Sequence, residues 1–492
     1  MSAIVEAGSA DRYELVVGLE VHVQLRTRTK AFCRCSTAFG AAPNTQVCPV
    51  CLGLPGALPV LNEHAVRLAV RTALVLGCTI NELSTFARKH YFYPDLPKGY
   101  QVTQYERPLA TGGQLEIGVL EGGTPIMVGI QRVHMEEDAG KLVHDRYPGA
   151  TAVDLNRAGI PLVEIVTAPE LHAPEAAGAW LRVLRHLLVF ADVSDCSMEE
   201  GSLRVDANVS VRPRSQVALG TRTEVKNLNS FSAVERAIAL EYARQCALFD
   251  AGAEVVSQTL LYDEGTDALR PARRKEAGED YRYFPDPDLP PLSLDAVWID
   301  ALRANMPEMP RARRARFMRE YQLTDYAADV LISTPTIADY YEGVARHHAD
   351  PRAAANWVMG EVLAAVKGTG TTLDDFPVRP SDLAELLDLV REGQVSNSAA
   401  KQVFQRMLEH PERPRAIIAR EGLARVADPA RLHALIDEAL AAHPAEAARL
   451  AAGETRLLGV LVGAVMQQSR GAADPAAVRQ LLAERFGGGA GG

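Results

Sequence analysis

The sequence lacks the features that would place the protein in a membrane or in a secretory route. No apolar run approaches the roughly eighteen uncharged residues that a membrane-spanning helix requires. Residues 1–12 contain acids and have no apolar core, unlike a signal peptide. We therefore expect a cytoplasmic protein that does not contact a membrane.

The motifs of several common enzyme classes are also absent. The pair Gly140-Lys141 comes nearest to a phosphate-binding P-loop, but the glycine five residues earlier and the following Ser or Thr are missing. No Rossmann signature joins a predicted strand to a helix, and neither a protein kinase signature nor a Gly-x-Ser-x-Gly elbow occurs. A nucleotide site of these familiar kinds is excluded.

Positive charge is not in surplus, because 52 Lys and Arg stand against 62 Asp and Glu, a formal net charge of −10. The surface as a whole is therefore not predicted to bind nucleic acid. Local basic clusters occur at residues 270–275, 311–319 and 413–425, although such runs are more often solvated helix faces. At 492 residues the chain allows about two to four domains.

The seven cysteines are an odd number, and four of them cluster, which does not indicate a disulfide framework. Cys33 and Cys35 form one pair, and Cys48 and Cys51 form another after twelve intervening residues. Both pairs lie in segments rich in Pro, Gly and Asn. Four thiolates complete a tetrahedral Zn²⁺ site, so we predict a structural zinc loop over residues 33–51.

Three consecutive carboxylates stand beside a histidine in residues 133–141. Alternate side chains of a strand point to the same face, so Glu136 and Asp138 should share a face with His134. An arbitrary acidic run is most often a solvated turn. The alternative is a cluster whose charge is neutralised by a cation.

Other predicted strands also present polar side chains on one face. In residues 19–25 apolar residues alternate with Glu20, His22 and Gln24, and Glu164 is flanked by apolar residues, where an unpaired carboxylate would be unfavourable. Oxygen-rich clusters with few nitrogens suit Mg²⁺, which often bridges nucleotide phosphates. A Mg²⁺-dependent phosphoryl-transfer site and wet edge strands are equally compatible with this pattern. The polar residues concerned are Glu20, His22, Glu136, Glu137, Glu164 and Asp206, followed by Lys226 and Asn227.

The order of the predicted elements indicates an α+β protein. Helices are predicted at residues 62–76, 171–191 and 232–250, between strands, and strand signals disappear from about residue 297. We predict a mixed or antiparallel sheet domain over 1–295, an all-helical domain over 296–412 and a helical tail over 413–492.

Long motifs covering the chain essentially from end to end resemble those of one family. They occupy residues 18–25, 91–95, 134–141, 154–157, 198–204, 226–231 and 280–286, and the distal part contributes 356–360 and 459–466. They are similar to the GatB/GatE family, whose bacterial members are B subunits of aspartyl/glutamyl-tRNA(Asn/Gln) amidotransferases. The resemblance implies a sheet domain shaped as a cradle for the tRNA acceptor end and a YqeY-like tail that binds the tRNA body.

The resemblance also implies a reaction. ATP would phosphorylate the side-chain carboxylate of Glu mischarged on tRNA(Gln), of Asp on tRNA(Asn), or of both, and ammonia would then displace phosphate. The ammonia would come from glutamine through a partner amidase, the A subunit, and a small C subunit would complete a heterotrimer. We find no Ser-Ser-Lys amidase arrangement in this chain.

The family's functional residues can be carried onto this sequence. Glu136 and Asp206 would lie close to the Mg²⁺ site, while Lys226 and Asn227 would contact phosphate or line the ammonia path. Family members without the cysteine quartet exist, so zinc should serve folding. The Mg²⁺ ligands that the resemblance implies are Glu20, His22, Glu137 and Glu164.

Two functions of other classes remain open at this point. One is a non-catalytic, zinc-stabilised RNA-binding protein whose acids hold structural ions, although convergent acids are a poor match for a polyanion. The other is an ATP-dependent ligase for a free amino acid, which would not need a long helical tail. The sequence does not decide which mischarged tRNA is the substrate.

Overall fold

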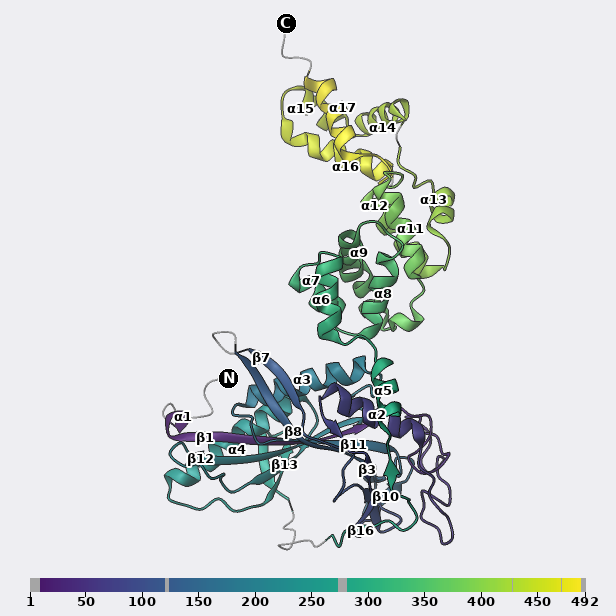
Figure 1. Ribbon diagram of the computed structural model, residues 1–492. Helices are drawn as coiled ribbons and strands as arrows, with labels where there is room; N and C mark the ends of the chain where they lie inside the picture. The colour runs from purple at the N-terminus through teal and green to yellow at the C-terminus, as the bar shows by residue number, and fades with distance from the viewer. Residues whose placement is uncertain (1–8, 120–123, 273–280, 427, 470, 488–492) are drawn as a thin grey trace. The chain divides into compact units, whose positions relative to one another are not determined.

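The computed structural model describes residues 9–119, 124–272, 281–426, 428–469 and 471–487 (Figure 1). The chain divides into two compact units, Met1–Pro310 and Arg311–Gly492. A large mixed sheet with helices forms the first unit, and the described part of the second is helical, which confirms the α+β class. The further division of the helical part near residue 412 stays a prediction.

The centre of the first unit is strand β1 (Tyr13–Gln24) of a ten-stranded sheet. Strand β1 pairs antiparallel with β12 on one side and β11 on the other, and β13 pairs parallel with β14. The strand order is β15 (Ala268–Pro271), β14 (Thr259–Asp263), β13 (Thr223–Leu228), β12 (Leu203–Pro213), β1, β11 (Pro161–Thr167), β8 (Pro125–Glu137), β6 (Ala110–Thr111) and β2 (Thr79–Ile80), with β7 (Gln114–Val119) also paired to β8.

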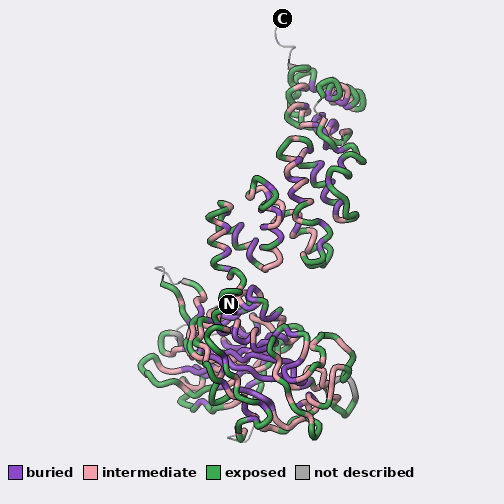
Figure 2. The backbone as a smooth tube through the Cα atoms, turned by 45° about the vertical axis from the view of Figure 1, so that its right-hand side comes forward, coloured by how far each residue is buried: buried purple, intermediate pink, exposed green. Residues whose placement is uncertain are grey.

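The two faces of this sheet differ because the side chains of β1 alternate as the sequence predicts. Leu19, Val21 and Val23 are fully buried, and they share one hydrophobic core with buried residues of three helices. In Figure 2 the buried backbone of the first unit gathers in its interior. Glu20, His22 and Gln24 project to the opposite face. The covering helices are α2 (Glu63–Val75), α3 (Pro174–Phe190) and α4 (Phe231–Asp250), which confirms the three predicted helices.

Local signals set the starts of these helices. The side chain of Asn62 accepts hydrogen bonds from the backbone N–H groups of His64 and Ala65, and Ser230 caps α4 in the same way. Helix α3 begins with Pro174, whose missing N–H is not needed in a first turn. The buried positions of each helix then recur at helical spacing and seal the apolar face of the sheet.

Three smaller sheets flank the large one in the first unit. Helix α5 (Ala296–Ala304) adds Ile299 and Leu302 to the same core, so this unit continues past residue 295 to Pro310. The small sheets are β16 (Phe284–Pro285) with β4 (Ala87–His90) and β5 (Tyr100–Thr103), β9 (Lys141–Tyr147) with β10 (Ala150–Asp154), and β3 (Leu83–Ser84) with β17 (Leu292–Ser293).

Helices make up the second unit throughout its described residues. Near the C-terminus a separate core contains Leu435, Ile436, Leu461, Val465 and Leu482. None of the helices in the described residues is long and apolar enough to cross a membrane. The helices are α6 (Pro310–Glu320), α7 (Asp325–Leu331), α8 (Pro335–Ala345), α9 (Pro351–Trp357), α10 (Leu363–Thr369), α11 (Pro380–Arg391), α12 (Asn397–Glu409), α13 (Pro414–Glu421), α14 (Pro429–Ala442), α15 (Pro444–Ala451), α16 (Leu458–Gln468) and α17 (Pro475–Gly487), with a π-helical turn at Val358–Val362.

Candidate active site

Three neighbouring strands bring histidines and carboxylates together on the polar face of the large sheet. In the register of the sheet, Glu164 of β11 lies between His22 of β1 and His134 of β8. The Nε2 atom of His22 is 3.2 Å from Glu136 Oε1 and 3.4 Å from Glu164 Oε2. His134 Nε2 is 3.2 Å from Glu164 Oε2. We call His22, His134, Glu136 and Glu164 the His–Glu cluster.

The charges of the His–Glu cluster depend on one another. Burial alone would lower the pKa of His22, but hydrogen bonds to Glu136 and Glu164 outweigh this and raise it to about 10. Burial alone would raise the pKa of Glu164, but hydrogen bonds from His134 and His22 hold it well below its usual range. Both carboxylates are buried, and Glu164 is ionised at neutral pH.

The raised pKa of His22 predicts a loss of stability in alkaline solution. Its contribution to stability is fully present below the unfolded pKa of about 6.5 and is lost as the pH rises through about 10. In metal-free protein, we expect the free energy of unfolding, measured by urea denaturation, to fall over this range. The fall should be smaller in His22→Gln, and parallel curves for the two proteins would contradict the assignment.

A second group of acids lies on the same face, on strands β1, β12 and β13. Oxygen atoms of Glu20, Asp206 and Glu224 all lie within 4.8 Å of one another. Lys226 neutralises part of this charge, since its Nζ is 2.5 Å from Asp206 Oδ2 and 2.8 Å from Glu224 Oε1. These carboxylates outweigh the effect of burial and raise the pKa of Lys226. We call Glu20, Asp206, Glu224 and Lys226 the lysine–acid cluster.

Asp138 shares the polar face with the two clusters, as the alternation in residues 133–141 predicts. Its carboxylate is 2.8 Å from the guanidinium of Arg204 and accepts a hydrogen bond from Gln24 Nε2 at 2.9 Å. The Nε of Arg157 is 3.6 Å from it. Much of the charge that the sequence places here is therefore neutralised by the chain's own cations.

Glu137 lies apart from the His–Glu cluster, which differs from the grouping implied by the family resemblance. Because adjacent side chains of a strand point in opposite directions, Glu137 follows Val133 and Met135 to the side away from Glu136. There its carboxylate pairs with Lys98 and accepts a hydrogen bond from Val102 N at 2.9 Å. The structure thus groups His22 and Glu164 with Glu136.

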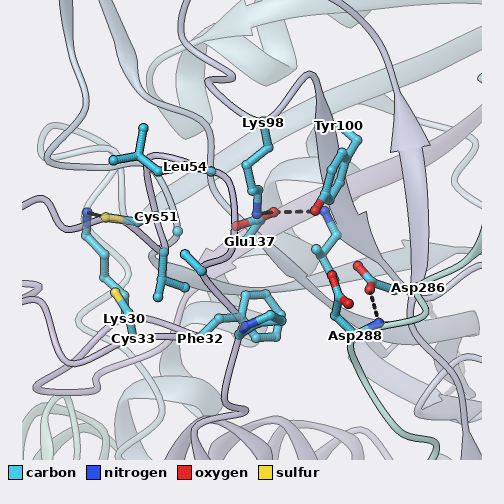
Figure 3. Close-up of a pocket in the computed structure, with 16 residues that line it drawn as sticks. Lys30, Phe32, Cys33, Cys51, Leu54, Lys98, Tyr100, Glu137, Asp286 and Asp288 are labelled. Atoms are coloured by element: carbon cyan, nitrogen blue, oxygen red, sulfur yellow. Dashed lines mark hydrogen bonds and ion pairs between the residues drawn. The ribbon is translucent and has the colours of Figure 1, made fainter.

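Glu137 and Lys98 line a pocket of about 180 Å³ beside the cysteine loop (Figure 3). Cys33 and Cys51 also reach this pocket, and so does Lys30. The Nζ of Lys30 is 3.7 Å from Cys51 Sγ and donates a hydrogen bond to the carbonyl of Leu155 at 3.3 Å. The wall of the pocket is therefore shared between the end of β8 and the cysteine loop.

Sulfur atoms of Cys33, Cys35, Cys48 and Cys51 all lie within 4.8 Å of one another, as the spacing predicts. The Cys33 thiol hydrogen-bonds to Cys51 and, together with Cys48 N–H and Lys30, lowers the pKa of the Cys51 thiol to about 4. A thiolate stabilised by N–H donors is a suitable ligand for a soft cation. The cluster is compatible with Zn²⁺.

Two residues of strand β13 have contacts that the sequence did not reveal. Asn227 has a left-handed backbone (φ 65°) and donates a hydrogen bond to the carbonyl of Tyr262 at 2.8 Å, so it ties β13 to β14. Glu224 was not among the predicted site residues. The only signal for it is its position two residues before Lys226, which places both on one face of a strand.

The donor set of the His–Glu cluster fits a divalent cation. One imidazole nitrogen and two carboxylate oxygens lie within 4.8 Å of one another, from His22, Glu136 and Glu164. Hard cations such as Mg²⁺ prefer carboxylate oxygens and retain several waters, and a site with three protein ligands leaves room for these. The buried Nδ1 of His134 has no hydrogen-bond partner in the described part of the chain, so one nitrogen of this cluster still lacks a hydrogen bond.

Residues 15–300 match the model of the GatB/GatE catalytic domain, and residues 339–486 match that of the GatB domain. The chain therefore belongs to the GatB/GatE family.

Full-length relatives support this conclusion. The chain is 47% identical over 477 residues to the B subunit of the aspartyl/glutamyl-tRNA(Asn/Gln) amidotransferase of Carboxydothermus hydrogenoformans, covering 96% of this chain and 99% of that protein. It is 49% identical over 476 residues to the protein of the same name from Moorella thermoacetica, covering 96% and 100%. The Geobacter sulfurreducens protein is 48% identical, with 97% and 100% covered.

Proposed function

We propose that this chain is the B subunit of a heterotrimer that converts Glu-tRNA(Gln), Asp-tRNA(Asn) or both to the corresponding amides, using ATP. The names of relatives that match nearly the whole chain support this role. The single structural observation that carries it is the meeting of His22, Glu136 and Glu164 on one sheet face. A protein that only bound RNA would gain little from such acids facing a polyanion.

The proposed chemistry solves the problem that a carboxylate is a poor acyl donor, because oxide would have to leave. An oxygen of the substrate's side-chain carboxylate attacks the γ-phosphorus of ATP, which forms an acyl phosphate and releases ADP. Ammonia then adds to the acyl carbon, and the carbon–oxygen bond to phosphate breaks. The products are the amide and inorganic phosphate, and the ammonia loses a proton to the medium.

The residues of the polar face would divide this work. His22, Glu136 and Glu164 would hold Mg²⁺, which neutralises the charge that builds up as two anions approach. The lysine–acid cluster lies on the neighbouring strands, where Lys226 offers a cation for a phosphate group. Glu137, which is paired with Lys98, would line the adjoining pocket and would not be a ligand of Mg²⁺.

Ammonia and assembly require other proteins in this proposal. A partner amidase, the A subunit, would hydrolyse glutamine, and the small C subunit would complete the complex. The decisive experiment measures ADP formation by the purified complex with glutamine, in the presence of mischarged tRNA, uncharged tRNA or free glutamate. ADP formation that needs the mischarged tRNA supports the proposal. ADP formed with free glutamate would indicate a small-molecule ligase, and none at all would indicate a binding protein.

Truncation tests the proposed contact between the tail and the tRNA body. The arginines of the basic cluster at 413–425 are less available than the sequence indicates, because Arg415, Arg420 and Arg425 pair with acids. The tail has a core of its own, joined to the preceding helices by the Arg425–Asp474 ion pair and by a hydrogen bond from the Ser396 hydroxyl to the carbonyl of Gly471, and we remove residues 428–492 as a whole. We expect the KM for tRNA to rise about tenfold or more, with kcat at saturating tRNA changed little.

The truncation needs a control for folding of the rest of the complex. Glutamine hydrolysis by the partner and the KM for ATP should stay near the values of the full-length complex. An unchanged KM for tRNA would contradict a tRNA-binding tail.

A further inference from the structure

Two tyrosines from distant parts of the chain stack face to face beside the polar face of the sheet. The rings of Tyr105 and Tyr283 are parallel within 4°, with centroids 4.0 Å apart. Tyr281 meets Tyr283 edge to face at 5.9 Å. Tyr105 keeps 48% of its surface exposed, so the stack is open to solvent on at least one side.

Both tyrosines are held by neighbours bound to strands, so the stack is a preformed surface. Gln104, next to Tyr105, accepts a hydrogen bond from Met135 N at 2.9 Å. On the other side, the carbonyl of Tyr281 accepts a hydrogen bond from His90 N at 2.9 Å, and Phe284 pairs with Arg88 in the β16–β4 ladder. An exposed aromatic surface that is already fixed can receive a flat ring with little further loss of side-chain freedom.

The tyrosine stack lies close to the His–Glu cluster. Met135, to which Gln104 is bound, stands between His134 and Glu136 on β8. Burial is the main cause that raises the pKa of Tyr283 to about 12, and the neighbouring tyrosines and the charge of Glu164 add to it. A group resting on the stack would therefore be a neighbour of the proposed metal ligands.

We infer that Tyr105 and Tyr283 form a stacking platform for the terminal base of the single-stranded 3′ end of the aminoacyl-tRNA. The aminoacyl ester is carried by the ribose of that last nucleotide, so its base must lie near the reacting carboxylate. Bases of single strands are commonly held by stacking on aromatic rings. A cation for the adjoining phosphate is at hand, because Lys89 Nζ lies 4.8 Å from the centre of the Tyr281 ring.

This inference rests on the proposed function. It assigns the stack to the terminal base of the tRNA and not to the adenine of ATP. Stacking does not distinguish sequences, which suits an end shared by tRNA(Gln) and tRNA(Asn). The pocket lined by Lys98 and Glu137, at the end of β8, is separate from the stack, because neither Tyr105 nor Tyr283 lines it. The two sources of a purine base can therefore be told apart by experiment.

Steady-state kinetics of the full complex provide the first arm of the test. We expect Tyr105→Leu and Tyr283→Leu to raise the KM for aminoacyl-tRNA about tenfold, with kcat and the KM for ATP within about twofold of wild type. Tyr105→Phe and Tyr283→Phe keep the ring and should retain the wild-type KM. The matched control is Tyr326→Leu, which removes a tyrosine that is 74% exposed in the helical unit.

Fluorescence provides the second arm and reads stacking directly. The probe is a mischarged tRNA whose terminal adenine is replaced by 2-aminopurine, whose emission is quenched when it stacks. The wild-type complex should quench the probe, both Leu variants should not, and excess ATP should leave the quenching unchanged.

The outcomes separate the inference from the function on which it rests. If both Leu variants still quench the probe and keep the wild-type KM for tRNA, in a complex that amidates normally, the stacking platform is wrong and the proposed function stands. A raised KM for ATP, or quenching that ATP reverses, would assign the stack to the nucleotide substrate and also overturn it. Absence of ATP-dependent amidation by the wild-type complex would reject the proposed function itself.

Discussion

Glu164→Gln is expected to lower kcat for ATP-dependent amidation by roughly a thousandfold. The substitution keeps the shape of the side chain and removes the charge that both His22 and His134 contact, at 3.4 and 3.2 Å. An amide oxygen is a much weaker ligand for Mg²⁺ than a carboxylate, so the cation and the triphosphate would be poorly held. Single-turnover formation of the amidated tRNA by the purified complex measures the effect.

The chain offers a matched control for this substitution. Glu170 follows the same strand and is exposed, and within the described residues its side chain accepts a hydrogen bond from Gly129 N, so Glu170→Gln should amidate within about twofold of wild type. Glutamine hydrolysis by the partner should be preserved in both variants. Normal amidation by Glu164→Gln would remove the His–Glu cluster from the reaction.

Cys51→Ser is expected to release one equivalent of zinc and to lower the melting temperature by on the order of 10 °C. Cys51 is the buried member of the quartet, and hydrogen bonds from Cys33 and Cys48 together with Lys30 lower the pKa of its thiol. A serine hydroxyl does not ionise at neutral pH and would leave Lys30 without its sulfur neighbour. Elemental analysis and a thermal melt of the purified complex measure both effects.

A lone cysteine of the same unit supplies the control for zinc release. Cys78 lies outside the quartet, so Cys78→Ser should keep its zinc. Because Cys51 and Glu137 line the same pocket, we also expect amidation to decline in Cys51→Ser as the loop loosens. Retention of a full equivalent of zinc by Cys51→Ser would contradict the four-cysteine site.

The two-residue period of strands made the chemistry of each face predictable from the sequence. It correctly separated Leu19 and Val21 from Glu20 and His22, and it placed His134, Glu136 and Asp138 on one face. The same period places Glu137 on the other side, whereas the family resemblance had grouped it with His22. The roles of these residues in catalysis stay predictions.

The partners of each acid could not be predicted, because they depend on how strands far apart in the sequence are aligned. His22 faces Glu164 only through the pairing of β1 with β11, and Asp206 meets Glu224 only through β12 and β13. From the sequence alone, we expected a bound cation to neutralise the charge of all these acids together. Lys226 and Arg204 supply much of the neutralising charge from within the chain.

The meeting of the four cysteines was predictable because cysteine spacing is a local signal, whereas the tyrosine stack was not. Tyr105 and Tyr283 come together only when β4 pairs with β16 and Gln104 binds β8. The compact unit that contains the sheet ends at Pro310 and not near the predicted boundary at residue 295, for a related reason. Helix α5 looks like the start of the helical part, but its apolar residues complete the core under the sheet.

The alignment of β11 with β1 and β8 limits how this region can change during evolution. Inserting or deleting one residue within β11 would turn Glu164 toward the helices and bring Val163 or Ile165 to face the two histidines. The side chain of Thr167 accepts a hydrogen bond from Leu19 N at 2.9 Å and helps to fix the strand against such a slip. Variation in length should accordingly be confined to the connecting loops, while the three strands keep a constant number of residues.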